Sequence, residues 1–397
     1  MVMPHKHSEP PGMGDRLQAE GRFSLAADAL YLDCAAQGPR LHAVLAAGHA
    51  MLDAGTSPWA LSYDEQEIRI EALRASMAQA LFDGDADGVA LVPSAAYGLA
   101  TAASNLGLAA GDAVLVLDSQ FPSNLLPWQQ RCAATSARIV VARRVAGQDW
   151  TDTVLATIDA EPCLRIVAVE HAHWHDGALL DLDRVAQRTR AAGAALVLDL
   201  SQSLGALPVD LARWQPDFIA AVGYKWLLGP AGLAWLWVAP RWRDEGIAIE
   251  QHWSARDAEV WQLKSDHRPR HRPGARRFDA GGVTDPLRVA MATTALDQLK
   301  EWGLANISLR LGQLTAEFDR ALDAHGLDTW KTHGHAPHFT ALRAPDEDQL
   351  KAAAGALRRE RVICTRRAGL LRIAPHLHVD EEDMQRVARI LAGAVPR

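Results

Sequence analysis

The stretch 195–238 reads ALVLDLSQSLGALPVDLARWQPDFIAAVGYKWLLGPAGLAWLWV. It holds three apolar runs of strand length, at 195–198, 218–222 and 233–238, separated by turn-forming and polar residues. Short, continuously apolar runs of this kind are typical of strands that are buried on both faces of a sheet. The stretch therefore predicts three strands in the middle of a large sheet.

The same pattern extends toward the N-terminus. Four more apolar runs lie at 89–92, 113–117, 139–142 and 165–169. Helix-like segments separate several of the runs, at 94–106, 123–134 and 181–193. Alternating strands and helices predict an α/β fold with a mostly parallel, doubly wound sheet of seven strands and helices on both faces.

Two charged residues follow consecutive strands of this predicted sheet. Asp199 directly follows the run 195–198, and Lys225 follows the run 218–222. Open α/β sheets bind ligands at the carboxyl ends of their strands, so both side chains are expected at one rim. Desolvation lowers the pKa of a lysine, and its neutral amine is a nucleophile. A carboxylate beneath a pyridine nitrogen keeps that nitrogen protonated. The pair indicates a site for pyridoxal 5'-phosphate, with Lys225 as the Schiff-base amine.

Two further rim segments suit the same cofactor. Ser94, Ala95 and Ala96 follow the run 89–92 and open a helix, whose free N–H groups and positive end favour a phosphate. Phe121 follows the run 113–117 and could stack on the cofactor ring. We expect these four residues to bind the cofactor.

Composition divides the chain into three parts. Residues 1–24 are polar and rich in Pro and Gly, and we expect a mobile N-terminal arm. Residues 25–285 form the predicted large cofactor-binding domain, whose first part is expected to pack on the small domain. Residues 286–397 form the predicted small C-terminal α+β domain. Its expected elements are a helical pair at 286–324, strands near 338–343 and 370–374, and helices at 346–360 and 380–394.

Segment 254–280 interrupts the alternating pattern because it is charged and rich in Pro. We expect a long surface loop, and a loop of this length could reach a second subunit.

The overall composition excludes several classes of protein. Lys and Arg number 41 against 48 Asp and Glu, which gives a formal net charge of −7 and disfavours a nucleic-acid partner. No apolar run approaches the roughly 20 residues that cross a bilayer, so no membrane association is expected. The four cysteines are far apart and form no CxxC pair, which is typical of a protein in the reducing cytoplasm.

A histidine cluster supports a remote alternative. His171, His173 and His175 occupy alternate positions next to Asp176. On a strand the three imidazoles would share one face and could bind the metal of a hydrolase. The order of the residues differs from the usual hydrolase motif, so we expect no metal. Instead these histidines, together with Trp174, are candidates to line the substrate cleft.

With these residues identified, the chain resembles the class V aminotransferases of PLP fold type I, a group that includes cysteine desulfurases and kynureninases. The resemblance rests on ALVLDLSQSLGALPVDL and DFIAAVGYKWLLGPAGLAWLWV, on YLDCAAQGP near the start and on LLRIAPHLHVDEEDMQRV near the end. It runs from about Leu30 to Val395. It implies a large sheet domain, a small C-terminal α+β domain and a homodimer with the cofactor near the interface.

The resemblance also implies residue roles. Lys225 would bind the cofactor and Asp199 would pair with its ring nitrogen. Gln202 would donate to the ring hydroxyl and Ser201 would pack on a ring face. The remaining implied contacts are Tyr224 with the phosphate, Thr284 with the phosphate of the neighbouring subunit, and Arg372 with the substrate carboxylate through a bidentate fork.

Two departures from the desulfurases bear on the reaction. The desulfurase nucleophile lies on a long loop before the C-terminal arginine, but Cys364 lies only eight residues before Arg372 and is expected at the start of a buried strand. Trp174 replaces a desulfurase Asn. We expect an aminotransferase acting at Cα of an amino acid, with a β-lyase of C–S or C–C bonds or an epimerase as the alternative.

Overall fold

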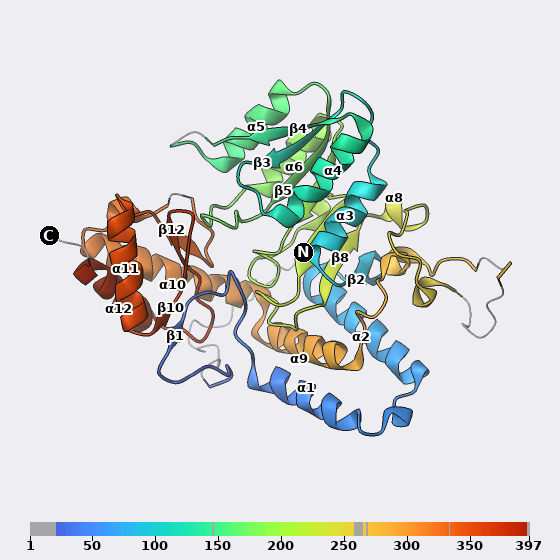
Figure 1. Cartoon of the computed structure of the whole chain (residues 1–397), viewed down its shortest axis with the longest axis horizontal. Coiled ribbons are helices and arrows are strands. Elements are labelled where there is room, and N and C mark those ends of the chain that lie inside the picture. The colour runs from blue at the N-terminus through green and yellow to red at the C-terminus, as the bar shows by residue number, and fades with distance from the viewer. Residues whose placement is uncertain (1–20, 145–146, 258–264, 267–268, 333, 395–397) are drawn as a thin grey trace, which may run out of the picture.

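The computed structural model describes residues 21–144, 147–257, 265–266, 269–332 and 334–394 (Figure 1). Most of the predicted mobile arm, residues 1–24, lies outside this part. Within it, Phe23 is buried and stacks on Trp302 at 5.8 Å between ring centroids. The end of the predicted arm is therefore packed onto the protein.

A seven-stranded sheet forms the centre of the larger part of the molecule. Its strands are β2 (Val89–Val92), β3 (Ala113–Leu117), β4 (Arg138–Ala142), β5 (Leu164–Glu170), β6 (Ala195–Asp199), β7 (Phe218–Val222) and β8 (Ala234–Val238). They lie in the order β2-β8-β7-β6-β5-β3-β4, and β8 runs in the direction opposite to that of the other six strands. The predicted mostly parallel α/β sheet is confirmed.

Both faces of the sheet are covered, as the continuous apolar runs predict. Val114 and Val116 of β3 pack with residues of α3 (Ala95–Asn105) and α4 (Leu126–Thr135), whereas Leu115 joins the core that contains residues of α5 (Trp150–Ala160) and α6 (Leu182–Ala191). Successive strand side chains point to opposite faces, so each apolar run contributes to two cores. The edge strand β4 is only half-buried.

The predicted helices form with small shifts at their ends. Helix α4 begins later than expected, because the 3-10 turn η3 (Pro122–Asn124) precedes it. Pro127 then occupies the first turn of α4, where a missing N–H costs no helical hydrogen bond. The short elements of this part are η1 (Pro58–Ala60), η2 (Ala86–Gly88), α7 (Leu211–Trp214), α8 (Pro240–Arg243) and η4 (Trp253–Ala255).

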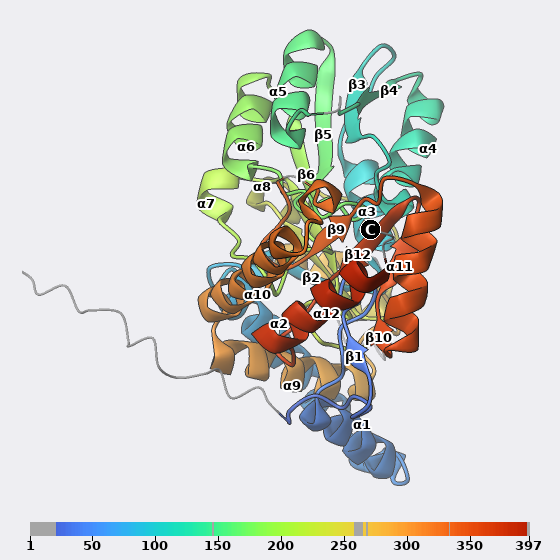
Figure 2. The same ribbon diagram turned by 90° about the vertical axis from the view of Figure 1, so that its left-hand side faces the viewer.

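The C-terminal part is a smaller α+β unit (Figure 2). Strands β11 (Thr365–Arg367), β12 (Leu370–Ile373) and β9 (Thr340–Leu342) form an antiparallel sheet in that order. The helices of this unit are α10 (Leu304–Ala324), α11 (Glu347–Arg359) and α12 (Glu381–Ala394), with the short turn η7 (Asp328–Trp330).

The N-terminal segment pairs with a strand of this smaller unit. Strand β1 (Leu30–Tyr31) pairs in parallel with β10 (Val362–Ile363), and Asp33 forms a bridge to Ala374. The chain then passes into α1 (His42–Ala54) and α2 (Tyr63–Leu81), which pack against α9 (Pro286–Trp302). Helix α9 thus extends toward the larger part, and the proposed division at residue 285 stays a prediction.

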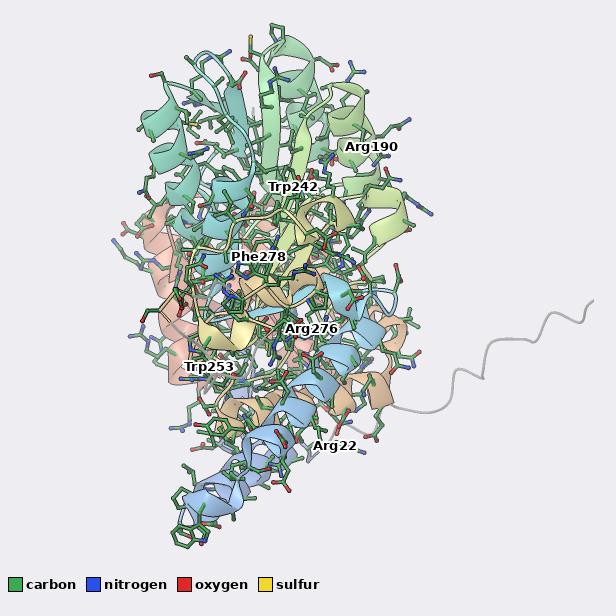
Figure 3. All side chains as sticks on the ribbon, turned by 90° about the vertical axis from the view of Figure 1, so that its right-hand side faces the viewer. Arg22, Arg190, Trp242, Trp253, Arg276 and Phe278 are labelled. Atoms are coloured by element: carbon green, nitrogen blue, oxygen red, sulfur yellow. The ribbon has the colours of Figure 1, made fainter. Side chains whose placement is uncertain are left out.

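Residues 258–264 and 267–268 of the predicted surface loop, 254–280, lie outside the described part of the chain. The last part of the segment differs from the prediction, because it forms η6 (Gly274–Phe278) and Phe278 is buried in the core on one face of the sheet (Figure 3). Arg276 on the same turn bonds Glu71 of α2 and Asp87. The apolar residues Ala275 and Phe278 explain the difference, because their burial outweighs the charged character of the surrounding sequence.

Candidate active site

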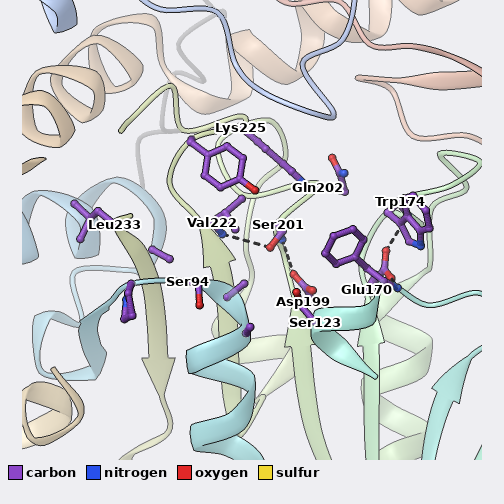
Figure 4. Close-up of a pocket in the computed structure, with 16 residues that line it drawn as sticks. Ser94, Ser123, Glu170, Trp174, Asp199, Ser201, Gln202, Val222, Lys225 and Leu233 are labelled. Atoms are coloured by element: carbon purple, nitrogen blue, oxygen red, sulfur yellow. Dashed lines mark hydrogen bonds between the residues drawn. The ribbon is translucent and has the colours of Figure 1, made fainter. Parts of the chain in front are cut away.

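One pocket lies at the carboxyl ends of five strands of the large sheet (Figure 4). Ser94 follows β2, Phe121 follows β3, Glu170 ends β5 and Asp199 ends β6. Lys225 follows β7 and reaches the same pocket. The other lining residues are Pro93, Ala95, Ala96, Ser123, Trp174, Ser201, Gln202, Val222, Tyr224, Leu233 and Ala234. The fold therefore brings together most of the residues that the sequence predicts for the cofactor.

Lys225 is a buried amine without a polar partner. Its side chain makes no hydrogen bond or ion pair with any residue that the structure describes, and Nζ lies 5.6 Å from the centroid of the Phe121 ring. Burial lowers its pKa to about 8, although the charges of Asp199 and Glu170 raise it. A substantial fraction of the amine is therefore neutral near physiological pH.

The loop that carries Lys225 is tightly folded. Gly229 N–H donates to the carbonyl of Gly223 at 2.9 Å, and Leu228 adopts a left-handed φ of 57°. This conformation costs a non-glycine residue roughly 1–2 kcal/mol. Leu228 is fully buried, so the packing around it holds the loop in this shape.

Asp199 is buried beside Lys225, and burial raises the pKa of its carboxyl. Oδ1 accepts a hydrogen bond from Ser201 N–H at 3.0 Å, and Ser201 Oγ accepts from Val222 N–H at 3.3 Å. Gln202 is anchored as well, because its amide donates to the Ala35 carbonyl at 2.9 Å and accepts from the Trp226 indole at 3.1 Å. These contacts orient the polar side chains at the carboxyl end of β6.

Glu170 is a site residue that the sequence analysis missed. It lies opposite Asp199 in the ladder between β5 and β6. One carboxylate oxygen accepts from Phe121 N–H at 2.9 Å and the other from Trp174 N–H at 2.8 Å. Burial, with a smaller contribution from the charge of Asp199, raises its pKa to about 7. Its position as the polar residue at the end of a central strand was the available signal, since Asp199 was identified in that way.

The start of α3 forms another wall of the pocket. Ser94 caps the helix by accepting a hydrogen bond from Tyr97 N–H at 3.1 Å. The N–H groups of Ala95 and Ala96 lie in the first helical turn, where no carbonyl within the helix can pair with them. Tyr224 lines the pocket next to Lys225.

Arg372 is buried on β12 rather than exposed as a strand charge, with only 1% of its surface accessible. Its guanidinium donates to the Trp174 carbonyl at 3.0 Å and to Asp33 Oδ1 at 3.3 Å. Its Nε is buried without a hydrogen-bond partner in the described residues. Arg372 does not line the pocket itself, but it adjoins the pocket through Trp174.

The three histidines do not share one face of a strand, although the rings of His173 and His175 lie 6.3 Å apart between centroids. Strand β5 ends at Glu170, so His171, His173 and His175 lie in the following turn and not on one face of a strand. His171 packs against Trp214, and His173 bonds Asp176 at 3.0 Å. None of the three lines the pocket, whereas Trp174 does. Within the described ranges, no group of three His, Cys, Asp or Glu residues is arranged to hold a metal ion.

Thr284 also lies away from this pocket. Its carbonyl accepts a hydrogen bond from the Gln66 amide of α2 at 2.6 Å.

The residues in the pocket fit pyridoxal phosphate. The cofactor needs an unbonded amine for its aldehyde, and Lys225 is buried without a partner. Its ring nitrogen needs a buried acid, which Asp199 supplies. Its phosphate needs N–H donors, and the first turn of α3 presents unpaired ones. Phe121 supplies an aromatic face near the amine.

Comparison with known proteins agrees with this chemistry. The family described as "Aminotransferase class-V" matches residues 30–369. An uncharacterized aminotransferase, YcbU, of Bacillus subtilis is 28% identical over 77% of this chain and 78% of its own length. Isopenicillin N epimerase of Streptomyces clavuligerus is 26% identical over 80% of this chain and 82% of its own.

Solved structures show the same fold. The cystine C-S lyase C-DES, in complex with its product cysteine persulfide, aligns with a TM-score of 0.81 at 21% identity. The alignment covers 92% of this chain and 98% of C-DES. The family match extends over most of the chain and includes the pocket residues from Ser94 to Lys225. The chain therefore belongs to the class V aminotransferase family, as a pyridoxal 5'-phosphate enzyme of fold type I that acts as an aminotransferase or a lyase.

Proposed function

We propose that this protein is an aminotransferase in which Lys225 binds the cofactor and moves the proton at Cα of an amino acid. One observation carries the proposal: a buried, unpaired lysine shares a pocket with a buried aspartate at the ends of adjacent strands. Burying either charged group without a partner costs free energy. The presence of both in one pocket therefore favours a ligand that interacts with the lysine and with the aspartate.

Pyridoxal phosphate, when bound, supplies an electron-accepting ring that stabilises negative charge at the substrate Cα. Asp199 holds the ring nitrogen in its protonated form, and Ser201 N–H keeps the carboxylate oriented. Lys225 Nζ accepts the Cα proton, and its pKa of about 8 is close to the operating pH of a general base. The substrate amine would first have to displace Lys225 from the cofactor, which frees this amine to take the Cα proton. The same amine would then deliver that proton to the cofactor carbon that carried the aldehyde, and water would release the keto acid.

Pocket residues around this pair orient the cofactor. Phe121 and Ser201 would hold the ring, and Gln202 would donate to its hydroxyl. Ser94, Ala95, Ala96 and Tyr224 would bind the phosphate. Support comes from their shared pocket and from the unpaired N–H groups at the start of α3.

Arg372 binds the α-carboxylate of the substrate. Its buried Nε lacks a partner in the described part of the chain, and its Nη1 is already positioned by the Trp174 carbonyl. A buried guanidinium with an unused N–H gains from a carboxylate ligand more than an exposed one does. Trp174 lines the pocket and selects the side chain.

The cysteines favour transfer over desulfuration. None of the residues that line the pocket is a cysteine. Cys364 lies between β10 and β11, and burial raises its pKa to about 12. A thiol with such a pKa is almost entirely protonated at neutral pH and is a poor nucleophile.

The enzyme acts as a homodimer. Leu52, Trp59, Tyr63 and Ile68, on α1, η1 and α2, are large apolar residues with more than half of their surface exposed. Clustered exposed apolar residues favour a protein interface. Thr284 bonds Gln66 of the same helix α2, which supports its contact with the cofactor phosphate of the partner subunit.

The test is the absorption spectrum of the holoenzyme during additions of single amino acids. An aminotransferase converts the cofactor stoichiometrically to its amine form and releases a keto acid. Release of pyruvate with ammonia, of alanine or of sulfide, without formation of the amine form of the cofactor, would show that the enzyme is a lyase and refute the proposal. Racemisation of the substrate would show that it is an epimerase. Lys225→Ala should lose the spectrum of the lysine-bound cofactor; a variant that keeps both colour and turnover would refute the role of Lys225.

The compartment stays a prediction from composition. Among the helices that the structure describes, none combines the length and the apolarity that a bilayer crossing needs.

A further inference from the structure

A second arginine lies at the edge of the pocket and was not assigned by sequence. Arg367 ends strand β11, directly before the turn at Ala368 and Gly369 that leads into β12. Its guanidinium carbon lies 5.9 Å from the centroid of the Trp174 ring. Trp174 lines the active-site pocket (Figure 4), so Arg367 lies over a pocket wall.

Arg367 differs from the neighbouring arginines in having no acidic partner. Arg366 pairs with Glu347 of α11, and Arg372 pairs with Asp33. Arg367 makes no hydrogen bond or ion pair through its side chain with any residue in the described ranges, and its one recorded side-chain contact is with the Trp174 ring. A guanidinium lying on an indole ring retains N–H groups at its edge, which can bind an anion.

The charge of Arg367 acts on the catalytic groups. It contributes to lowering the pKa of Lys225 and also that of Arg372, after the larger effect of burial on each. Two cations thus influence Lys225 from the side of β11 and β12, whereas the acids Asp199 and Glu170 lie at the strand ends. Arg372 already pairs with Asp33, so Arg367 is the one of these two cations that lacks an acidic partner among the described residues.

We propose that Arg367 and Trp174 form a second anion-binding subsite, which selects amino acids that carry a carboxylate on the side chain. The inference rests on the proposed function and specifies its substrate class. Arg372 takes the α-carboxylate, and Arg367 takes the side-chain carboxylate through the guanidinium edge that Trp174 leaves open. The short acidic amino acids and their keto acids are the expected substrates.

The experiment compares pairs of amino acids that differ in one charge: L-glutamate with L-glutamine, and L-aspartate with L-asparagine. The variant is Arg367→Gln in the holoenzyme. The matched control is Arg366→Gln, which removes a charge from the adjacent position, where the arginine is paired with Glu347. Rates of the first half-reaction give kcat and KM for each amino acid.

The wild-type enzyme should prefer the acidic member of at least one pair. Arg367→Gln should raise KM for that acidic amino acid about tenfold or more, as expected on loss of a charge-assisted hydrogen bond, and leave KM for its amide partner within about twofold. Arg366→Gln should change neither. An equal loss for acid and amide would instead assign Arg367 to the α-carboxylate, and a wild-type enzyme without preference for acids would overturn the proposal.

A binding measurement separates this inference from the proposed reaction. Succinate and butyrate are titrated into the holoenzyme, with Trp fluorescence and the cofactor spectrum as readouts. Succinate should bind more tightly than butyrate, and Arg367→Gln should remove the difference. If no amino acid converts the cofactor while succinate binding still depends on Arg367, the aminotransferase proposal fails and the subsite stands. Equal binding of both acids to the wild-type enzyme would refute the subsite.

Discussion

Glu170 and Asp199 lie opposite each other at the ends of β5 and β6, and their surroundings give them different tasks. Glu170 accepts two backbone N–H groups, those of Phe121 and Trp174, and so holds two aromatic residues of the pocket in place. Among the described backbone N–H groups, Asp199 accepts a hydrogen bond from that of Ser201. Burial raises the pKa of its carboxyl, and the positive charge of Lys225 partly offsets this rise. Glu170 is therefore a positioning residue, and Asp199 is available to a ligand.

The raised pKa of Glu170 makes the stability of the apoenzyme depend on pH. The folded protein retains the proton up to about pH 7, whereas the unfolded chain releases it near the ordinary pKa of 4.5. The contribution of this group to stability is therefore fully present below pH 4.5 and is lost as the pH rises to about 7. Glu170→Gln cannot titrate, so its melting temperature should fall less than that of the wild type between these pH values. If the melting temperatures of both proteins changed by the same amount across that pH range, the raised pKa of Glu170 would be contradicted.

At the scale of elements, a buried ion pair joins helix α2 to the edge of the sheet. Arg74 Nη2 lies 2.7 Å from Asp279 Oδ2, and Arg74 Nη1 also donates to the Val89 carbonyl at 2.6 Å. Asp279 Oδ1 accepts from Leu91 N–H at 2.8 Å. One carboxylate thus connects α2, β2 and the end of η6.

Asp279→Ala should strongly destabilise the protein, because it removes the carboxylate that pairs with Nη2 of the buried Arg74 guanidinium and leaves only the half-buried Glu71 beside its Nε. Loss of one member of a buried pair costs roughly 3–5 kcal/mol. Urea unfolding measures the change. The control is Asp348→Ala, since Asp348 pairs with Lys351 on the surface and such pairs contribute about 0–1 kcal/mol. Equal midpoints for the two variants would show that the buried pair is not a structural anchor.

The lysine loop depends on the N-terminal segment that lies against it. Gly38 N–H donates to the Tyr224 carbonyl at 2.9 Å, and a Cβ at Gly38 would overlap the backbone oxygen of Lys225. Only glycine permits this approach of the two chains.

Gly38→Ala should displace the loop and weaken cofactor binding by more than tenfold, about 1.4 kcal/mol. Titration of the apoenzyme with pyridoxal phosphate, followed by absorbance, gives the affinity. The control is Gly107→Ala, because a Cβ there meets no atom within 4 Å. An unchanged affinity in Gly38→Ala would mean that the loop tolerates the shift.

At the scale of the whole molecule, two distant parts of the chain complete the pocket region. Arg372 and Asp33 are 339 residues apart and form a buried contact. Strands β1 and β10 also pair, so an N-terminal and a C-terminal segment lie side by side in the smaller unit (Figures 1 and 2).

The proposed homodimer gives a prediction at this scale. Trp59 is 83% exposed in the single chain, and a charge at this position should prevent close apolar contact between subunits. Trp59→Asp should therefore halve the mass measured by light scattering. Leu309→Asp is the control, because Leu309 on α10 is 61% exposed in the smaller C-terminal unit. A wild-type protein with the mass of one chain would refute the dimer.

Sequence alone predicted the large sheet because its information is local. Each strand appears as an apolar run, and burial on both faces removes polar residues from that run. Asp199 and Lys225 were identified for a related reason: a charged residue directly after a buried strand lies at the rim of the sheet. The ends of the apolar runs, and the residues that follow them at the rim of the sheet, can be identified without knowledge of distant contacts.

Tertiary structure decided what local patterns do not contain. The histidines at 171, 173 and 175 alternate in sequence, yet the chain turns after Glu170, so that His171 packs against Trp214 while His173 bonds Asp176 and contacts His175. The protonation of Glu170, the burial of Arg372 against Asp33 and the position of Arg367 over Trp174 all depend on residues far apart in the chain. Desolvation and charge pairing are set by the neighbours in space, and only the folded chain brings those neighbours together.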